Sequence, residues 1–330
     1  MRKTILWVLV MMLFSLNACT QDTKDSKQAD LTNGTYTATK EGFQHEHVTV
    51  SVTVEDNKII DVSIDEITDF PVTVTEVPVR EIPAAILKHQ TYNVDSITGA
   101  TLTSNAIKQA VKDCLDQAGG SQFFSKEVEK PVSEDKEDVY TDVLVIGAGG
   151  SGIMSAIEAS IGNTIDESSG LNVMLIEKAG FVGGNTSVSG GVRYLYEDET
   201  GKYDQAWVDA SLEKEMAVLQ PYMELDFNEE LMRHEIEVNS YTNQLLENIG
   251  VKSKDNWGYK AFDTNDGHLD PKWNGSYFTY AVQPYLEKSD IDVRLNTEAI
   301  ELLQNDNGAI IGAKVKDKES TYNVYAKKVV

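Results

Sequence analysis

Hydrophobic and polar residues alternate strictly along residues 48–54, where a valine stands at every second position. This period of two predicts a strand with one buried face and one exposed face. Turn-forming residues follow at 55–58, and residues 59–64 are predicted as a second strand, so that the two form a β-hairpin. Residues 34–39 are predicted as an earlier strand.

Two helices are expected beside these strands. A short helix is predicted over residues 82–89, with a proline near its first turn. A longer helix is predicted over residues 104–117, where apolar residues recur on one face and where Ser104 or Thr103 is expected to be the N-cap. Together these elements predict an α+β domain over residues 31–120.

The pattern changes at residue 142. A continuous apolar run over residues 142–146 predicts a strand buried on both faces, and a helical run follows at 153–160. The residues between them are Gly147-Ala148-Gly149-Gly150-Ser151-Gly152. A Gly-x-Gly-x-x-Gly sequence between a buried strand and a helix predicts a dinucleotide site. Gly147 is expected to make the turn, Gly149 to let the backbone approach a pyrophosphate, and Gly152 to allow close packing of the helix on the strand.

A second buried strand is predicted over residues 172–176 and ends at Glu177. The Glu177 carboxylate is expected to accept a hydrogen bond from a ribose hydroxyl and to repel a 2′-phosphate, which favours FAD or NAD over NADP. The spacing from the glycines exceeds the usual roughly 20 residues, and a surface insertion at residues 162–170 would account for it. An α/β Rossmann-like domain is therefore predicted over residues 139–330, and the charged segment 121–138 is predicted as a linker.

Further elements complete the predicted second domain. Helices are predicted over residues 204–219 and 228–249, and strands over residues 295–303, 307–315 and 322–330. The chain stops within the last of these strands. We therefore expect this domain to be incomplete, as in a fragment or a truncated chain.

Composition excludes several classes of protein. The 330 residues include 29 Lys and Arg against 53 Asp and Glu, which gives a net charge of −24. Such an acidic chain is not expected to bind nucleic acid, because phosphate groups are neutralised by Lys and Arg. Two cysteines are too few for a disulfide scaffold or for a cysteine-based zinc or iron–sulfur site. Cys114 lies on the apolar face of a predicted helix and is interpreted as a core residue.

The N-terminus has the features of a targeting segment. Arg2 and Lys3 precede an apolar run at residues 5–16 that is short for a transmembrane helix. Leu-Asn-Ala-Cys follows and resembles a bacterial lipobox, so residues 1–19 are predicted to be a lipoprotein signal peptide and Cys19 to be lipidated. Residues 20–30 would form a tether that holds the protein on the extracytoplasmic face of the cell membrane. An ordinary cleaved signal is the alternative.

Residues 95–101 are Asp-Ser-Ile-Thr-Gly-Ala-Thr and lie just before a predicted helix. A helix N-terminus with clustered hydroxyl groups favours a phosphate. Residues 34–120 resemble the FMN-binding domain of the sodium-pumping NADH:quinone oxidoreductase and of extracytoplasmic flavin reductases, in which this motif occurs. The resemblance implies that a flavin transferase esterifies Thr101 with the phosphate of FMN. The other implied residues of this site are Asp95, Gly99 and Ala100.

Residues 183–191 contain Gly-Gly-Asn-Thr and Ser-Gly-Gly, shortly after Glu177-Lys178. This block resembles the flavoprotein subunit family of fumarate reductase, urocanate reductase and succinate dehydrogenase, and nicotinamide dehydrogenases have no such block at this place. The resemblance implies noncovalent FAD. The implied FAD-binding residues beyond the glycines and Glu177 are Ala148, Lys178, Gly184, Asn185, Thr186, Gly190, Gly191 and Ala299.

The two resemblances imply a path for electrons. A membrane electron donor would reduce FMN on Thr101, and electrons would pass to FAD and then to the C=C bond of an unsaturated carboxylate such as fumarate or urocanate. The family's proton donor would follow residue 330, so no catalytic residue is assigned, and His268 is considered for a catalytic part without being assigned one. Two alternatives stay open. One is an electron-transfer flavolipoprotein without substrate chemistry, and the other is an oxidase or dehydrogenase that works in the opposite direction.

Overall fold

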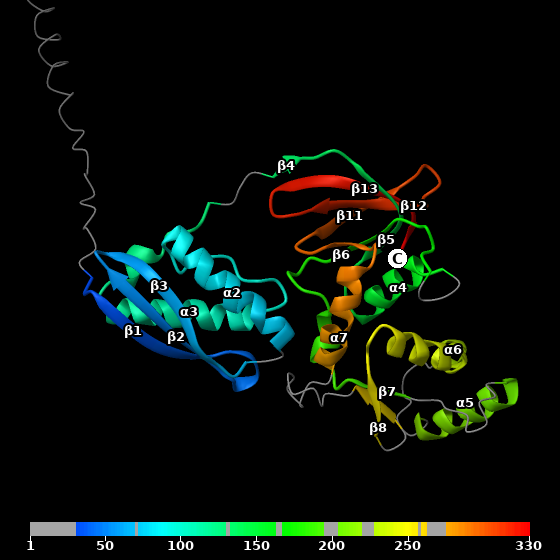
Figure 1. Ribbon diagram of the computed structural model, residues 1–330. Helices are drawn as coiled ribbons and strands as arrows, with labels where there is room; N and C mark the ends of the chain where they lie inside the picture. The colour runs from blue at the N-terminus through cyan, green and yellow to red at the C-terminus, as the bar shows by residue number, and fades with distance from the viewer. Residues whose placement is uncertain are drawn as a thin grey trace, which may run out of the picture.

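Figure 1 shows the computed structural model of the chain, which describes residues 31–69, 72–129, 133–162, 167–194, 204–219, 228–256, 259–262 and 275–330. The chain forms a first unit, residues 31–129, and a second unit, residues 133–330. Within the described ranges, no helix combines the length and the apolar character needed to cross a lipid bilayer. Cys19, the predicted signal peptide and the predicted tether all lie outside the described residues.

A three-stranded antiparallel sheet forms one layer of the first unit, in the order β1-β2-β3. The strands are β1 (Gly34–Glu41), β2 (His47–Glu55) and β3 (Lys58–Ile67). The alternating valines of β2 are all buried, and helices α2 (Val72–His89) and α3 (Thr101–Gln117) cover them. The predicted α+β architecture is confirmed, because the period of two places one whole face of β2 in the core.

Both helices of the first unit begin earlier than the sequence predicted. The added turns of α2 carry Val74 and Val77, which are buried against residues of the second unit. This contact between distant parts of the chain stabilises the turns and is invisible to local periodicity. Helix α3 has Ala100 at its N-cap position and no side-chain cap, so the predicted capping by Ser104 or Thr103 is wrong.

Cys114 occupies the core of the first unit, as predicted. It is fully buried, and its thiol donates a hydrogen bond to the Val50 carbonyl over 3.6 Å. Burial raises the pKa of the Cys114 thiol to about 11. Because the thiolate is the reactive form of cysteine, this residue serves packing.

The connection between the units is shorter than the predicted linker. A 3-10 helix, η2 (Ser121–Phe124), follows α3, and Phe124 is buried in the core of the first unit. Strand β4 (Glu134–Asp135) pairs with a strand of the second unit. Both ends of the segment 121–138 therefore belong to the folded units. The charged composition of the segment does not predict these contacts.

The second unit contains a seven-stranded mixed sheet in the order β10-β6-β5-β13-β12-β11, with β4 paired to β13. Strands β10, β6, β5 and β13 run parallel, and β11, β12 and β13 are antiparallel neighbours. Their bounds are β5 (Val139–Ile146), β6 (Val173–Ile176), β10 (Asp292–Arg294), β11 (Glu298–Gln304), β12 (Ile310–Lys316) and β13 (Ser320–Val329). This arrangement confirms the predicted Rossmann-like architecture.

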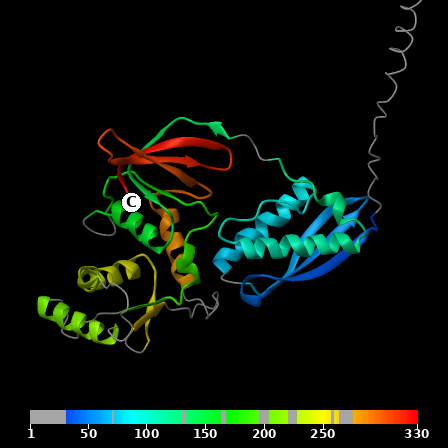
Figure 2. The same ribbon diagram turned by 180° about the vertical axis from the view of Figure 1, so that it is seen from behind.

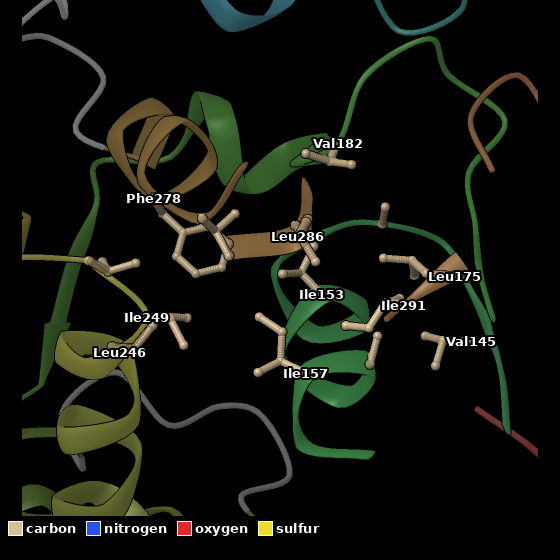
Figure 3. Packing of buried hydrophobic residues seen from close by; sticks show 14 of the residues in the cluster. Val145, Ile153, Ile157, Leu175, Val182, Leu246, Ile249, Phe278, Leu286 and Ile291 are labelled. Atoms are coloured by element: carbon tan, nitrogen blue, oxygen red, sulfur yellow. The ribbon is translucent and has the colours of Figure 1, made fainter. Parts of the chain in front are cut away.

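Side chains of the central strands alternate between two buried faces. Val143 and Val145 of β5 face a core built with helices α4 (Gly150–Ser160), α6 (Glu229–Asn248) and α7 (Gly275–Lys288). Figure 3 shows Ile153 and Ile157 of α4 between the strands and the α6 residues in this core. Leu144 faces the other way, into a cluster with residues of β6, β12 and β13. Burial on both faces explains the continuous apolar run.

The remaining elements lie beside this core. Helix α5 (Gln205–Leu219) packs against α6, as Figures 1 and 2 show. A small antiparallel sheet has the order β7-β9-β8. Its strands are β7 (Val192–Tyr194), β8 (Ser253–Asn256) and β9 (Tyr259–Phe262).

Candidate functional site

The 95–101 loop of the first unit is held by side chains of α3. The Ile97 N–H donates a hydrogen bond to Ser104 Oγ over 3.1 Å, and Ser104 Oγ donates to the Ala100 carbonyl over 2.8 Å. Gly99 adopts a positive φ of 85°, which a residue with a side chain rarely adopts. The loop therefore has a defined conformation that leads directly into the first turn of α3.

Lys108 fixes the beginning of this loop. Its Nζ donates to Ser96 Oγ over 2.7 Å and to the Val94 carbonyl over 3.2 Å. Burial lowers the pKa of Lys108, while the neighbouring charge of exposed Asp95 acts in the opposite direction. Lys108 of α3 thus holds both neighbours of Asp95, the first residue of the motif, in place.

The hydroxyl groups near the start of α3 differ in exposure. Thr103 and Ser104 are buried, whereas Thr98 and Thr101 are exposed. Among the described residues, no side chain or carbonyl forms a hydrogen bond with the Thr101 hydroxyl. Thr101 begins a helix of 17 residues, whose free N–H groups and dipole favour an anion at this end. Thr101 is therefore exposed at a helix end that favours an anion.

A buried carboxylate, that of Asp69, forms a hydrogen bond with the first turn of α3. Asp69 accepts hydrogen bonds from Thr103 Oγ1 and from the Phe43 N–H, both over 2.7 Å. Burial raises the pKa of Asp69, these two hydrogen bonds oppose the shift, and the nearby charge of Glu46 adds to it. Asp69 therefore connects the turn η1 (Phe43–His45) to the first turn of α3.

The glycine loop, residues 147–152, joins β5 to α4 in the second unit. Gly147 has a φ of 100°, which makes the predicted turn. A Cβ added to Gly152 would collide with the Gly147 carbonyl, so helix and strand approach as closely as predicted only because Gly152 has no side chain. At Gly149 a Cβ would have its nearest neighbour, the Gly183 carbonyl oxygen, at 4.0 Å. A Cβ added to Gly147 would meet no atom within 4 Å, so there is open space beside the turn at Gly147.

Glu177 lies beside the glycine loop. Its carboxylate accepts hydrogen bonds from the Ala148 N–H and from the Ala179 N–H, each over 2.8 Å. The side chain is half-buried at the carboxyl end of β6, and its neighbour Lys178 is exposed. A carboxylate held in this way has remaining oxygen lone pairs for a ribose hydroxyl.

The 183–191 loop reaches the glycine loop from the other side. The Gly183 N–H donates to the Ala148 carbonyl over 2.6 Å, and Gly183 forms a β-bridge with Gly149. Thr186 Oγ1 accepts a hydrogen bond from the Gly150 N–H over 3.0 Å, in the first turn of α4. Gly184, Asn185 and Gly190 are exposed, and Gly191 is buried.

A second layer of hydroxyl groups holds this loop. The 3-10 helix η3 (Gly184–Val188) packs on α7, where Ser187 Oγ and Thr279 Oγ1 lie 2.7 Å apart in a buried hydrogen bond. A Cβ on Gly183, whose φ is 112°, would collide with both hydroxyl groups. The Gly-Gly pair thus allows the loop to lie directly on α7.

Ala299 lies near this site, because the residues just before its strand form hydrogen bonds with the segment that contains Glu177. The Thr297 N–H donates to the Glu177 carbonyl over 2.8 Å, and the Asn296 N–H donates to the Ala179 carbonyl over 2.9 Å. Ala299 is the second residue of β11, pairs with Val315 of β12 and is partly buried. The segment that leads into β11 therefore lies against the segment that contains Glu177.

Both sites fit the flavin groups that the sequence implies. The glycine loop presents backbone without side chains at the N-terminus of α4, which suits the pyrophosphate of FAD. The exposed Thr101 hydroxyl at the N-terminus of α3 suits the phosphate of FMN. Bound FAD would supply the redox chemistry, and the residues above would bind and orient it.

Other features lie apart from these sites. His45 Nδ1 pairs with Glu41 at 2.6 Å, and His47 Nε2 lies 3.7 Å from Glu66. No cluster of His, Cys, Asp and Glu suited to a metal occurs among the described residues. His268 lies outside the residues that the structure describes.

An open surface hollow lies at the amino end of β5, the opposite end of that strand from the glycine loop, and is therefore separate from the FAD site. It is lined by Tyr140, Thr141, Asp142, Asn172, Ile311, Tyr325, Ala326 and Lys327.

Sequence reasoning missed several supporting residues. Asp69 lies in a polar stretch after a strand, and only its burial reveals its function. Phe181, between Glu177 and Gly183, is 6% exposed and packs against the first unit. Its large apolar side chain in a segment of small residues was the one available signal.

Comparison with known protein families supports this division of the chain. Residues 42–116 match the FMN-binding domain, and residues 142–330 match the FAD dependent oxidoreductase family. The first match contains the 95–101 loop. The second contains the glycine loop, Glu177 and the 183–191 loop.

Individual relatives agree with these matches. The chain is 33% identical over 261 residues to a urocanate reductase of Eggerthella lenta, an alignment that covers 74% of this chain and 40% of that protein. It is 26% identical over 295 residues to an NADH:fumarate oxidoreductase of Klebsiella pneumoniae, covering 85% of this chain and 29% of that protein. The solved open conformation of a flavocytochrome c3 fumarate reductase is similar with a TM-score of 0.47 and 24% identity, over 64% of this chain and 38% of that chain.

The chain spans less than half the length of each of these relatives. The second family match nevertheless covers more than half of the chain itself, from residue 142 to residue 330. The chain therefore belongs to the FAD dependent oxidoreductase family and carries an FMN-binding domain ahead of its FAD-binding part.

Proposed function

We propose that this chain is part of a reductase that passes electrons from FMN on Thr101 to noncovalent FAD and on to the C=C bond of an unsaturated carboxylate. The observation that carries the proposal is that one chain presents both an exposed Thr101, whose hydroxyl has no hydrogen-bond partner among the described residues, and a glycine loop at the N-terminus of α4. Relatives named for urocanate, fumarate and acrylate support this class of substrate.

Attachment of FMN is a phosphoryl transfer. A bond forms between Thr101 Oγ and the phosphorus of FMN while the phosphoanhydride of an activated flavin nucleotide breaks, and the nucleoside monophosphate leaves. The hydroxyl proton passes to a base of the flavin transferase. Gly99 keeps the loop tight beside the phosphate, and the N-terminus of α3 stabilises its charge.

On the second unit, Gly147, Gly149 and the first turn of α4 would bind the pyrophosphate, and Glu177 would bind the ribose. Thr186, Asn185, Gly190 and Gly191 would approach the flavin ring and its phosphates. Reduction of the substrate then adds a hydride to one carbon and a proton to the other. The lipobox-like sequence at Cys19 favours a membrane electron donor on the extracytoplasmic side.

The attachment site is tested by mass spectrometry of chain produced together with a flavin transferase. We expect the peptide that contains Thr101 to gain one FMN moiety, and Thr101→Ala to lose it completely. Thr98→Ala is the matched control, because it removes an exposed hydroxyl from the same loop. An unmodified wild-type peptide, or an adduct retained in Thr101→Ala, would contradict the proposal.

The substrate class is tested on the complete, flavin-loaded reductase of which this chain is part, after reduction without oxygen. Mixing with urocanate, fumarate or acrylate should restore the absorbance of oxidised flavin with at least one of them. A saturated analogue such as succinate is the control and should not. If none of these acids reoxidises the reduced protein, the proposed enoate reduction is contradicted.

A further inference from the structure

A buried apolar cluster joins the two flavin-site regions. It contains Val74 and Val77 of α2, Ala100 of the 95–101 loop, and Ala179 and Phe181 of the segment 177–183, with Ile97 partly buried beside them. Ala179 is 7% exposed and Phe181 is 6% exposed. In both views of the molecule, α2 is on the side of the first unit that faces the second (Figures 1 and 2).

The two loops also approach each other closely at Gly99, next to this cluster. A Cβ added to Gly99 would lie 2.8 Å from Phe181 Cζ and 3.7 Å from Ala179 Cβ. Thr101, the proposed attachment residue, follows Gly99 by two positions. The ring of Phe181 therefore packs against the loop that would carry FMN.

The same segment is fastened to the FAD site at both of its ends. Glu177 accepts a hydrogen bond from the Ala148 N–H, and Gly183 donates one to the Ala148 carbonyl. Residues 178–182 thus bridge from the glycine loop to the 95–101 loop within one short segment. A displacement of this segment would move both sites.

Further contacts fix the relative orientation of the units. A Cβ added to Gly180 would lie 3.3 Å from Val77 Cγ1. Lys318, in the turn between β12 and β13, forms an exposed ion pair with Glu81 of α2 at 3.4 Å. An exposed pair of this kind contributes little stability, so we assign the docking mainly to the apolar cluster.

We propose that this contact is the electron-transfer dock of the protein and that Phe181 is a positioning residue, which sets the distance and orientation between the two flavins. The inference rests on the proposed function. In the docked state two electrons leave the reduced flavin on Thr101, which is oxidised, and reduce FAD. Protons are released to solvent at the first flavin and taken up at the second.

The dock itself is tested without any flavin. In the full chain, Val77→Cys with Gly180→Cys should form a disulfide under mild oxidation, because the side chains at these positions are within reach of one. Ile60→Cys with Gly180→Cys is the control, since Ile60 is exposed on β3 and outside the cluster. Equal cross-linking in both pairs, or none in the first pair, would overturn the docked arrangement.

The function of the dock is tested by rapid mixing of flavin-loaded protein with a reductant. Phe181→Ala should slow electron transfer between the flavins severalfold, because the transfer rate falls steeply as two redox centres move apart. Phe181→Leu should recover most of that loss. The midpoint potentials and the content of both flavins should stay unchanged, which a general loss of structure would not allow. Phe123→Ala, an exposed aromatic residue outside the cluster, is the control.

The cross-linked chain separates the possible outcomes. If the docked state is the transferring state, the disulfide form should transfer electrons at least as fast as the same variant after reduction of the disulfide. A disulfide form that transfers only after its release would overturn the proposal. If the disulfide forms but chain produced together with a flavin transferase gains no FMN on Thr101, the dock stands and the proposed function alone is contradicted.

Discussion

The two units hold their candidate sites in different ways. In the first unit, one continuous loop and the first turn of one helix contain every implied residue, from Asp95 to Thr101. In the second unit, the implied residues come from the glycine loop, the end of β6, the 183–191 loop and the entrance to β11. One sequence motif was enough to predict the first site, whereas several separate motifs had to be combined to predict the second.

This difference predicts different responses to change. A covalent site needs one reactive hydroxyl and a loop that presents it, so most of the surrounding unit serves stability. A noncovalent site depends on the mutual placement of several backbone segments. Substitutions of supporting residues in the second unit should therefore reduce FAD binding, whereas those in the first unit should lower stability and spare the hydroxyl.

The largest effect should come from Gly152→Ala. The added Cβ would collide with the Gly147 carbonyl, and relieving the collision requires a shift of α4 against β5. Overpacking of this kind costs up to about 3 kcal/mol in the free energy of unfolding, and FAD should no longer copurify. Chemical denaturation and flavin content measure both effects. Ser151→Ala, on the exposed side of the same turn, is the control and should change neither quantity. If Gly152→Ala retains FAD, the predicted sensitivity of the second site to backbone placement is wrong.

Glu177→Ala should have a smaller effect on the same unit. The Ala148 and Ala179 N–H groups would lose a charged acceptor, and hydrogen bonds to charged groups contribute about 1.5–3 kcal/mol. Hydrogen exchange of the glycine loop should accelerate, while exchange in β2 should not change. Glu177→Gln should lie between the two, since one oxygen acceptor remains. Glu301→Ala, an exposed substitution on β11, is the control, and faster exchange throughout both units would show that they do not respond separately.

The smallest effect should come from Asp69 in the first unit. Asp69→Ala leaves the Phe43 N–H without its acceptor and should cost about 1–2 kcal/mol. Asp69→Asn can keep both bonds, because its amide oxygen accepts from Phe43 and its NH₂ group donates to the Thr103 hydroxyl. Both variants should still accept FMN on Thr101. Covalent flavin lost in Asp69→Asn would show that this carboxylate belongs to the attachment chemistry.

The pH dependence of Asp69 sharpens this prediction. Burial raises the pKa of this carboxyl in the folded protein, so the folded state binds its proton more tightly than the unfolded chain. The stability that Asp69 contributes is therefore present below the ordinary value of about 3.9 and is lost as the pH rises through the raised pKa. The unfolding free energy of wild type minus that of Asp69→Asn should fall over this range. A difference that rises with pH would contradict the assigned shift.

Periodicity predicted most of the fold because most elements are locally determined. The valines of β2 and the apolar run of β5 each determine their burial through their own spacing. The early start of α2 could not be predicted, because Val74 and Val77 are stabilised by Ala179 and Phe181, which are distant in sequence.

The residues of the candidate sites show the same difference between local patterns, which a sequence reveals, and distant contacts, which it does not. Gly147, Gly152 and Glu177 were assigned correct positions, since a strand–loop–helix pattern fixes their geometry. The contributions of Asp69, Thr279 and Phe181 depend on contacts between separate segments, and no single-sequence pattern contains them. The same holds for the cap of α3, where Ser104 bonds back to Ala100 and no side chain caps the helix.

The central claim is that one chain holds two flavins, one covalent and one not. Acid precipitation of purified protein, produced with a flavin transferase, tests it most directly by separating flavin in the pellet from flavin in the supernatant. The account predicts equal amounts, with FMN bound to the pelleted chain and FAD released. A colourless pellet, or a supernatant without an adenine-containing flavin, would contradict it.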